Sequence, residues 1–456
     1  MVSSCLPDPI TWADETFGAC QLGDPRRTAR AAMLGAAMLA RPAASLPQQH
    51  GTMARLKGAY HLLHSDAVTH AALLAPQFEQ TRRAAAAHPL VLLLHDNTLL
   101  DYSHHPTTEG LGRIGNGRGR GFVVHSVLAV LPTPRQVLGL AAQATFVHGP
   151  KQAGETLRQR QARRRESDLW PEAAQAIGTP GAGTWVHVGD READCFRFLT
   201  ACRQAGCHVL VRAAKDRRVA LADETIDTCL AAVKCLSAVD EQERLIPASA
   251  TRPARQATLK LGFGAVTLQP PRQEPSGPPL PVWLIHAWED PAPTEGEPID
   301  WVLLSSLPVE TPAQGWERID WYRRRWTIED YHQCLKTGCR IEQRQLGDQA
   351  ALERLLAICA PVAVDLLRLR DLARADPDAL AQQHLPADLV AVIAALAQVP
   401  VEQLTLQQVL HTVARRGGWL ARRGDGPPGW KTLWRGWQEI HFLREGRALQ
   451  PPPAPT

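Results

Sequence analysis

Four polar side chains that could serve metal and phosphate chemistry recur at helical spacing late in the chain. Tyr322, Arg325, Glu329 and Lys336 stand at offsets of 0, 3, 7 and 14. At about 100° per residue they fall within roughly 60° of arc, on a line about 20 Å long. The carboxylate can hold a metal ion, and the two cations and the phenol can hold phosphates. The alternative is a solvated amphipathic face, the usual explanation of polar residues at this spacing.

Two aspartates upstream end apolar runs that have the character of strands. Asp96 follows the run 91–95, and Asp190 follows the run 184–189. Open sheets deliver carboxylates in this way to the carboxyl edge of their strands. Taken singly, either residue could cap a helix or belong to a turn, and Asp194 could be a cap as well. Together with a glutamate on a basic, aromatic helix, the two aspartates favour a metal site.

With these residues in place, the chain resembles the bacterial DDE transposases of the insertion-sequence-4 group, which carry a YREK signature. Asp96 and the motif Asp190–Asp194 match the first two acidic motifs, and Tyr322, Arg325, Glu329 and Lys336 match the signature. The resemblance covers nearly the whole chain; its further motifs are Leu22–Arg27, Gly121–Ser126, Arg416–Trp419 and Trp434–Trp437.

The resemblance implies a two-metal site for phosphoryl transfer. Asp96, Asp190 and Glu329 would hold two Mg²⁺ ions about 3.5–4 Å apart, and Mn²⁺ could substitute because both ions prefer carboxylate oxygens. Tyr322, Arg325 and Lys336 would bind DNA phosphates. An enzyme of this group nicks the element ends, excises them through hairpin intermediates and joins them to target DNA.

Further DNA contacts follow from the resemblance and from the position of basic residues. Trp301 stands where the family holds an extruded base, although a Trp opening an apolar run is more often a core residue. Arg191 and Arg212 lie at predicted strand ends near the carboxylates. We also expect the N-terminal cluster of Arg26, Arg27 and Arg30 to be exposed and to bind DNA.

Composition limits the class of protein. The formal net charge of the 456 residues is +4, so the overall charge is a weak signal for nucleic acid. The segment Lys151–Arg165 is strongly basic, which suits an acidic polymer but could also be a solvated surface. No Cys-x-x-Cys pair occurs among the ten cysteines, and we expect reduced, mostly buried thiols. Without a signal peptide or an apolar run near 18 residues, the sequence predicts a cytoplasmic protein that does not enter a membrane. The resemblance implies a bacterial protein associated with the nucleoid.

The order of the expected elements indicates the fold class, which is α/β (α+β): a ribonuclease-H-like mixed sheet flanked by helices, with a β-rich insertion and helical N- and C-terminal domains. We expect a strand hairpin, a basic helix, a second helix, a strand and a final helix over 121–148, 154–178, 193–205, 207–212 and 312–337. The expected domains are an N-terminal DNA-end-binding domain, a catalytic domain, a dimerisation domain and a disordered tail, over 1–85, 86–345, 346–445 and 446–456; the insertion occupies about 216–306 of the second.

Two other function classes remain open on sequence grounds. The chain could be a ribonuclease-H-like nuclease that cuts DNA without joining ends, or a non-catalytic, transposase-derived DNA-binding protein. A transposase would bind double-stranded DNA at inverted-repeat ends and at the target, as a homodimer with contacts in the C-terminal region. Inverted repeats beside the reading frame would distinguish these classes.

Overall fold

The computed structural model describes residues 8–149, 154, 156, 159, 163–246, 254–272, 277–293, 296–422, 426 and 428–448. Most of the basic segment 151–165 and of the predicted tail 446–456 lies outside these residues. The chain divides into two compact units. Unit 1 comprises Met1–Ala84, Asn97–Arg163 and Ile328–Thr456, and unit 2 comprises Ala85–Asp96 and Arg164–Thr327. Among the described residues, no helix is long and apolar enough to cross a membrane.

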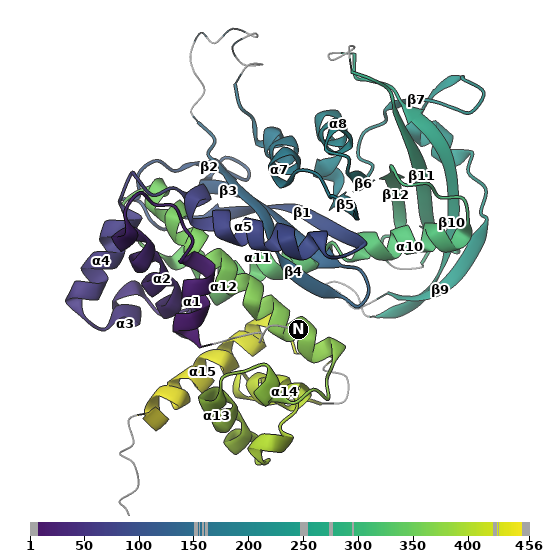
Figure 1. The fold of residues 1–456 in the computed structure, drawn as a ribbon. Coiled ribbons are helices and arrows are strands. Elements are labelled where there is room, and N and C mark those ends of the chain that lie inside the picture. The colour runs from purple at the N-terminus through teal and green to yellow at the C-terminus, as the bar shows by residue number, and fades with distance from the viewer. Residues whose placement is uncertain are drawn as a thin grey trace, which may run out of the picture. The chain divides into compact units, whose positions relative to one another are not determined.

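Unit 1 begins with five helices, α1–α5 (Figure 1): Pro9–Phe17, Pro25–Ala40, Leu46–His50, Met53–Leu63 and His70–Ala86. The start of α2 follows the expected rule, because the Asp24 side chain accepts a hydrogen bond from the Arg26 amide and Pro25 occupies the first turn. The apolar face of α2, which includes Leu34 and Met38, is buried, and α2 packs against α1, α4 and α12.

The sheet of unit 1 consists of β2 (Gly112–Ile114), β3 (Gly119–Leu131), β4 (Gln136–Phe146) and the end of β1 (Leu90–Asp101). The predicted hairpin is confirmed, since β3 and β4 pair antiparallel. β3 lies between β2 and β1. The long helix α12 (Gln349–Ala375) packs against β4. This sheet and α12 form the core of unit 1.

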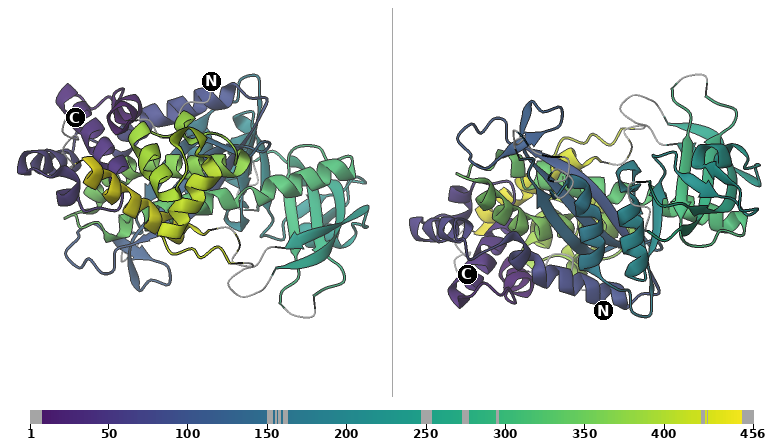
Figure 2. Two further views of the ribbon diagram at one scale, coloured as in Figure 1. Left: turned by 90° about the horizontal axis from the view of Figure 1, so that it is seen from below. Right: turned by 90° about the horizontal axis from the view of Figure 1, so that it is seen from above.

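The remaining helices of unit 1 form a cluster that appears in yellow-green in Figure 2. It contains η5 (Ala381–Gln383), α13 (Ala387–Ala397), η6 (Val401–Gln403), α14 (Leu406–Arg416) and α15 (Trp430–Ala448). The backbones of α14 and α15 approach closely at two glycines. A Cβ atom on Gly417 would lie 1.8 Å from the Thr432 carbonyl oxygen, and one on Gly436 would lie 1.7 Å from that of Val413.

Unit 2 is built on parallel strands that begin with the first half of β1. β5 (Thr184–Gly189) pairs parallel with β1 on one side and with β6 (His208–Arg212) on the other. Three helical segments accompany these strands: η1 (Glu166–Asp168), α7 (Leu169–Ile177) and α8 (Phe196–Gln204). The helix that we expected over 154–178 is therefore shorter, and its basic first half falls mostly on residues that are not described.

The β-rich insertion extends the sheet of unit 2 beyond β6. Its elements are β7 (Arg218–Ala220), β8 (Ile226–Thr228), α9 (Cys229–Lys234), β9 (Asp240–Ile246), β10 (Arg255–Leu268), β11 (Leu280–Glu289) and β12 (Asp300–Ser305). The strand order from β6 is β12-β11-β10-β7-β8, with β9 also paired to β10. The helix α10 (Pro312–Arg323) runs along β10 (Figure 1). The expected fold class is thus confirmed: a mixed sheet flanked by helices, with helical segments at both ends of the chain.

One prediction about secondary structure is wrong. The segment 312–337 is not a single helix, because α10 ends at Arg323 and a new helix, α11 (Trp326–Gln333), follows a two-residue break. At the break, the Arg324 and Arg325 amides bond to carbonyls three residues back, which is 3₁₀ geometry. After α11 the chain continues as a five-residue π-helical segment, η3 (Cys334–Gly338). Tyr322, Arg325, Glu329 and Lys336 therefore do not project from one face of one helix.

Candidate active site

Asp96 lies within β1, which continues to Asp101, and Asp190 directly follows β5, the parallel neighbour of β1. In the β1–β5 ladder, Leu94 pairs with Val188. Asp96 follows Leu94 by two residues within β1, and Asp190 follows Val188 by two residues, directly after β5 ends at Gly189. Side chains alternate along a strand, so the Asp96 carboxylate belongs to the face of β1 that Leu94 occupies. Parallel strands lie about 4.8 Å apart. This separation lets two carboxylates share a ligand.

Arg325, in the break after α10, contacts this carboxylate pair. Its Nη1 atom lies 3.8 Å from Oδ2 of Asp96, and both side chains are largely buried, at 11% and 15% exposure. Tyr322 is buried at the end of α10. Burial raises the pKa of the Tyr322 hydroxyl, while Arg325 and Arg212 nearby oppose the shift. The phenol therefore stays protonated at neutral pH and can donate a hydrogen bond.

An aromatic and basic surface adjoins Tyr322 within unit 2. The Trp301 ring meets the Tyr322 ring edge to face, with centroids 5.3 Å apart. Trp301 is half-buried in β12, so it is neither a core residue nor free surface. Arg212 ends β6, where its Nη2 donates to the Asp300 carbonyl at 3.0 Å.

Trp326 was missed by sequence reasoning: its side chain is 57% exposed, and the Arg325 guanidinium lies 5.4 Å from its ring centroid. An exposed Trp beside an Arg is the signal that could have identified it.

Two aspartates in the segment after β5 have different structural roles. Asp190 caps the short helix η2 (Arg191–Ala193), because its Oδ1 accepts from the Glu192 amide at 2.9 Å. Asp194 is 1% exposed and accepts from the Ala214 and Lys215 amides at 2.8 Å and from Arg217 Nε at 2.7 Å. Asp194 is thus a structural anchor, whereas Arg191 is exposed at the edge of the site.

Two buried histidines lie on the same two strands, His95 in β1 and His187 in β5. As expected, His95 and His187 pack inside their strands, where both are 0% exposed. The His95 Nε2 and His187 Nδ1 atoms are 2.7 Å apart, and Phe198 contacts both rings. Burial lowers the pKa of His187 to about 3. His187 is therefore uncharged at neutral pH, and the two rings link β1 to β5.

Glu329 and Lys336 belong to unit 1. Glu329 is half-buried in α11, and the Lys336 Nζ atom lies 3.7 Å from Oε1 of Glu342. Across the part of the chain that the structure describes, no three His, Cys, Asp or Glu side chains are grouped closely enough to hold a metal ion. Six of the predicted site residues therefore belong to unit 2: Asp96, Asp190, Arg325, Tyr322, Trp301 and Arg212. The described residues contain no complete three-carboxylate cluster.

The N-terminal arginines differ from one another in exposure. Arg26 is exposed, whereas Arg27 is half-buried and donates from Nη1 to the Leu22 carbonyl at 3.0 Å. Arg30 is also half-buried. The expectation of three exposed arginines is therefore wrong for two of them, because they lie against the loop and helices that precede and follow α2.

The ends of the chain match two transposase families. Residues 9–68 match the transposase DNA-binding family, and residues 362–450 match the dimerisation domain of Tn5 transposase. Among solved structures, a piggyBac transposase in a synaptic complex with hairpin DNA is similar over 98% of this chain and 83% of that chain, at 9% identity and a TM-score of 0.39. The chain thus carries the DNA-binding and dimerisation domains of a transposase at its two ends.

Proposed function

We propose that this protein is a cut-and-paste DNA transposase of the insertion-sequence-4 group, with Tyr322, Arg325, Glu329 and Lys336 as its YREK residues. The observation that carries the proposal is the position of Asp96 on β1 and of Asp190 at the end of the adjacent strand β5, with the Arg325 guanidinium 3.8 Å from the Asp96 carboxylate. The transposase domains at both ends of the chain supply the context of DNA and of a paired complex.

The donor chemistry of the pair fits Mg²⁺, or Mn²⁺ in its place. Mg²⁺ is bound in phosphoryl-transfer sites by one or two carboxylates together with substrate phosphates and water, so two aspartates on adjacent strands form a sufficient protein half-site. Glu329, four residues after Arg325 in the chain, would be the third ligand. When bound, two such ions would activate the attacking oxygen and stabilise the leaving one.

The protein's own side chains bind and orient the DNA backbone. Arg325 offers a planar fork to a phosphate while its charge offsets that of Asp96, and the protonated Tyr322 hydroxyl donates to a phosphate oxygen. Lys336 and Arg212 add positive charge, with Arg191 at the edge. These contacts would hold a strand end still while it is nicked, closed as a hairpin and joined to target DNA.

Aromatic side chains next to the phosphate ligands support a hairpin intermediate. A tight hairpin requires a base to leave the stack, and an aromatic platform stabilises such a base by about 1–3 kcal/mol. Trp301, held edge-on by Tyr322, is the platform that we propose. The exposed Trp326, beside Arg325, is available as a second aromatic surface for the strand that remains.

The substrate would be double-stranded DNA with inverted repeats at the element ends, bound by a homodimer through the N-terminal domain with its Arg26, Arg27 and Arg30. The test is to identify the repeats that bracket the reading frame and to incubate labelled ends with the purified protein and Mg²⁺. Nicked, hairpin and target-joined products are expected in that order. Cleavage without joining would indicate a nuclease instead, and binding without cleavage would indicate a non-catalytic derivative.

A further inference from the structure

The orientation of the short helix α11 depends on contacts outside the helix. It has eight residues, Trp326–Gln333, and isolated helices below about 12 residues are marginal in water. A break precedes it and a π-helical segment follows, so neither neighbour continues its hydrogen-bond ladder. Side chains that hold α11 therefore fix how it is rotated, and with it the direction of Glu329.

Asp330 of α11 is held by side chains from three other elements. Its Oδ2 atom lies 2.7 Å from Nη2 of Arg370 and 3.7 Å from Nη2 of Arg135, and its Oδ1 accepts from the indole Nε1 of Trp430 at 2.9 Å. The three donors come from α12, from the turn between β3 and β4, and from the first residue of α15. Both carboxylate oxygens are thus engaged, which fixes the plane of the carboxylate as well as its position.

The donors are themselves held in place. Arg370 is 4% exposed and also pairs with Asp371 at 3.0 Å, while Arg135 Nε lies 3.4 Å from the other oxygen of Asp371. The Arg370 guanidinium lies 4.4 Å from the ring centroid of Trp430, a cation–π geometry. Arg374 adds a further positive charge close to these two carboxylates and two guanidiniums. The contacts of Asp330 thus belong to a largely buried ionic cluster.

We propose that Asp330 is a positioning residue for Glu329 and that Trp430 links it to the C-terminal helices, so that these helices control the chemical step as well as pairing. The proposal rests on the proposed function, in which Glu329 is a metal ligand. Adjacent residues on a helix project about 100° apart, so an Asp330 clamped from three sides sets the direction of Glu329. Arg370, Asp371 and Trp430 all lie in the segment that matches the dimerisation domain.

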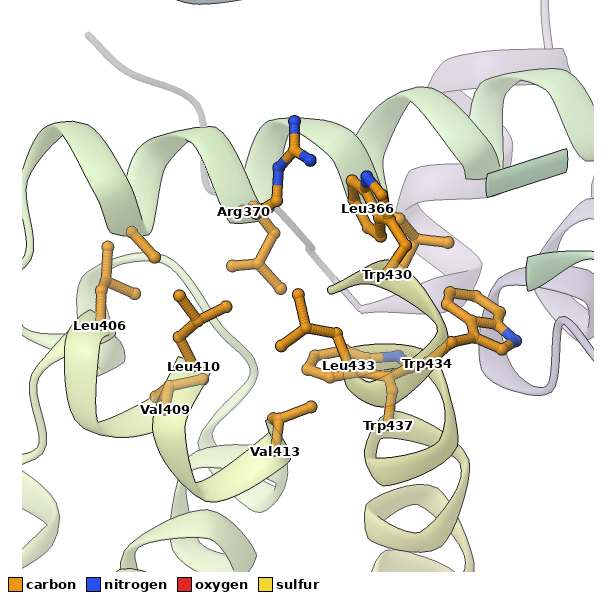
Figure 3. A pocket seen from close by; sticks show the side chains of 12 residues that line it. Leu366, Arg370, Leu406, Val409, Leu410, Val413, Trp430, Leu433, Trp434 and Trp437 are labelled. Carbon is orange, nitrogen blue, oxygen red and sulfur yellow. The ribbon is translucent and has the colours of Figure 1, made fainter. Parts of the chain in front are cut away.

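The same region offers a matched control. Trp430 and Trp434 both line a small apolar cavity of about 40 Å³ between α12, α14 and α15. Figure 3 shows the Trp430 indole beside Arg370 and the Trp434 ring directed away from it. Among the described residues, the buried Trp434 Nε1 has no hydrogen-bond partner. Replacing either Trp by Phe enlarges the same cavity, but only Trp430→Phe removes a hydrogen bond to Asp330.

The test compares Trp430→Phe, Trp434→Phe and Asp330→Asn in the full-length protein. Single-turnover cleavage is measured on element ends that are already bound and paired, over a range of Mg²⁺ concentrations. We expect Trp430→Phe to be roughly tenfold slower, as for loss of one hydrogen bond to a charged acceptor, and to need several-fold more Mg²⁺. Asp330→Asn should behave alike or worse, Trp434→Phe should stay near wild type, and end binding and pairing should be unchanged in all three.

Equal effects of the two Trp substitutions on rate and on Mg²⁺ requirement would overturn the proposal. Hydrogen exchange of the α11 amides gives a second readout that needs no activity: exchange should accelerate in Trp430→Phe and Asp330→Asn but not in Trp434→Phe. If the wild-type protein fails to cleave DNA, the proposed function falls, and this exchange comparison still decides whether Trp430 and Asp330 hold α11. If Trp430→Phe does not fold, Asp330→Asn decides both measurements.

Discussion

The guanidinium of Arg325 lies 3.8 Å from the carboxylate of Asp96, although one residue follows a helix and the other lies within a strand far earlier in the chain. Both side chains are largely buried, where opposite charges stabilise each other. In the proposed function, a DNA phosphate would compete with Asp96 for Arg325, and a metal ion would compete with Arg325 for Asp96.

The first prediction concerns the three proposed metal ligands. Asp96→Ala, Asp190→Ala and Glu329→Ala should each abolish Mg²⁺-dependent nicking of element ends, while end binding, which depends on phosphate contacts elsewhere, stays largely intact. Gel-based cleavage and mobility-shift assays on the same DNA separate the two effects. Appreciable cleavage by any one variant would remove that residue from the metal site.

The second prediction concerns Arg325. Arg325→Ala should lower the cleavage rate by at least about tenfold, since it removes a charge-assisted contact to phosphate and the positive charge beside the Asp96 carboxylate. The neighbouring Arg323 is exposed and pairs with Asp320 at 3.3 Å, so Arg323→Ala is the control and should have little effect. Indistinguishable cleavage rates for the two variants would show that the Asp96 contact has no catalytic consequence.

The third prediction separates nicking from hairpin formation. Trp301→Ala should leave the first nick near its normal rate but slow hairpin closure by roughly ten- to a hundredfold, because an extruded base loses its platform. Trp283 is half-buried in the neighbouring β11, and Trp283→Ala is a control for the loss of an aromatic from this sheet. Should both steps slow equally in Trp301→Ala, Trp301 would be a packing residue only.

The fourth prediction distinguishes Asp194 from Asp190, four residues before it. Asp194→Ala should reduce the free energy of unfolding by about 3–5 kcal/mol, because Arg217 would be left buried without its carboxylate partner. Asp223 is a suitable comparison, as an exposed aspartate that bonds to Thr225, and its replacement by Ala should cost far less. Urea unfolding monitored by tryptophan fluorescence measures both, and similar midpoints would contradict the anchoring role.

The fifth prediction is a pH dependence of stability from His125. Burial lowers its pKa to about 3, and its Nδ1 lies 2.7 Å from Oδ1 of Asn97. Because the unfolded chain binds a proton below about pH 6.5 and the folded one does not, stability should fall by about 2–3 kcal/mol between pH 7 and pH 4.5. His125→Gln should lose this part of the dependence. An unchanged pH profile in that variant would mean that other groups cause the loss.

The sequence predicted that Asp190 follows a strand, because an apolar run that stops at a carboxylate is a local pattern, but it did not predict that β1 continues through Asp96 to Asp101. It predicted the capped start of α2 at Asp24 for the same reason. The break between α10 and α11 was missed, since neither Gly nor Pro marks it and the residues at 324 and 325 are good helix formers. The contacts of Asp330 with Arg370 and Trp430 join distant parts of the chain, and no local pattern reports such a contact.

The C-terminal motifs Arg416–Trp419 and Trp434–Trp437 each contain a glycine at the crossing of α14 and α15, which gives these motifs a structural explanation. Gly417 and Gly436 leave no room for a side chain, since any Cβ would overlap a carbonyl oxygen of the other helix. Selection for a folded protein is therefore enough to keep both, whether or not the chain still cuts DNA. A copy that had lost its carboxylates by mutation would retain these motifs for as long as it folded. These two glycines therefore report on the fold of the C-terminal region and not on whether the chain cuts DNA.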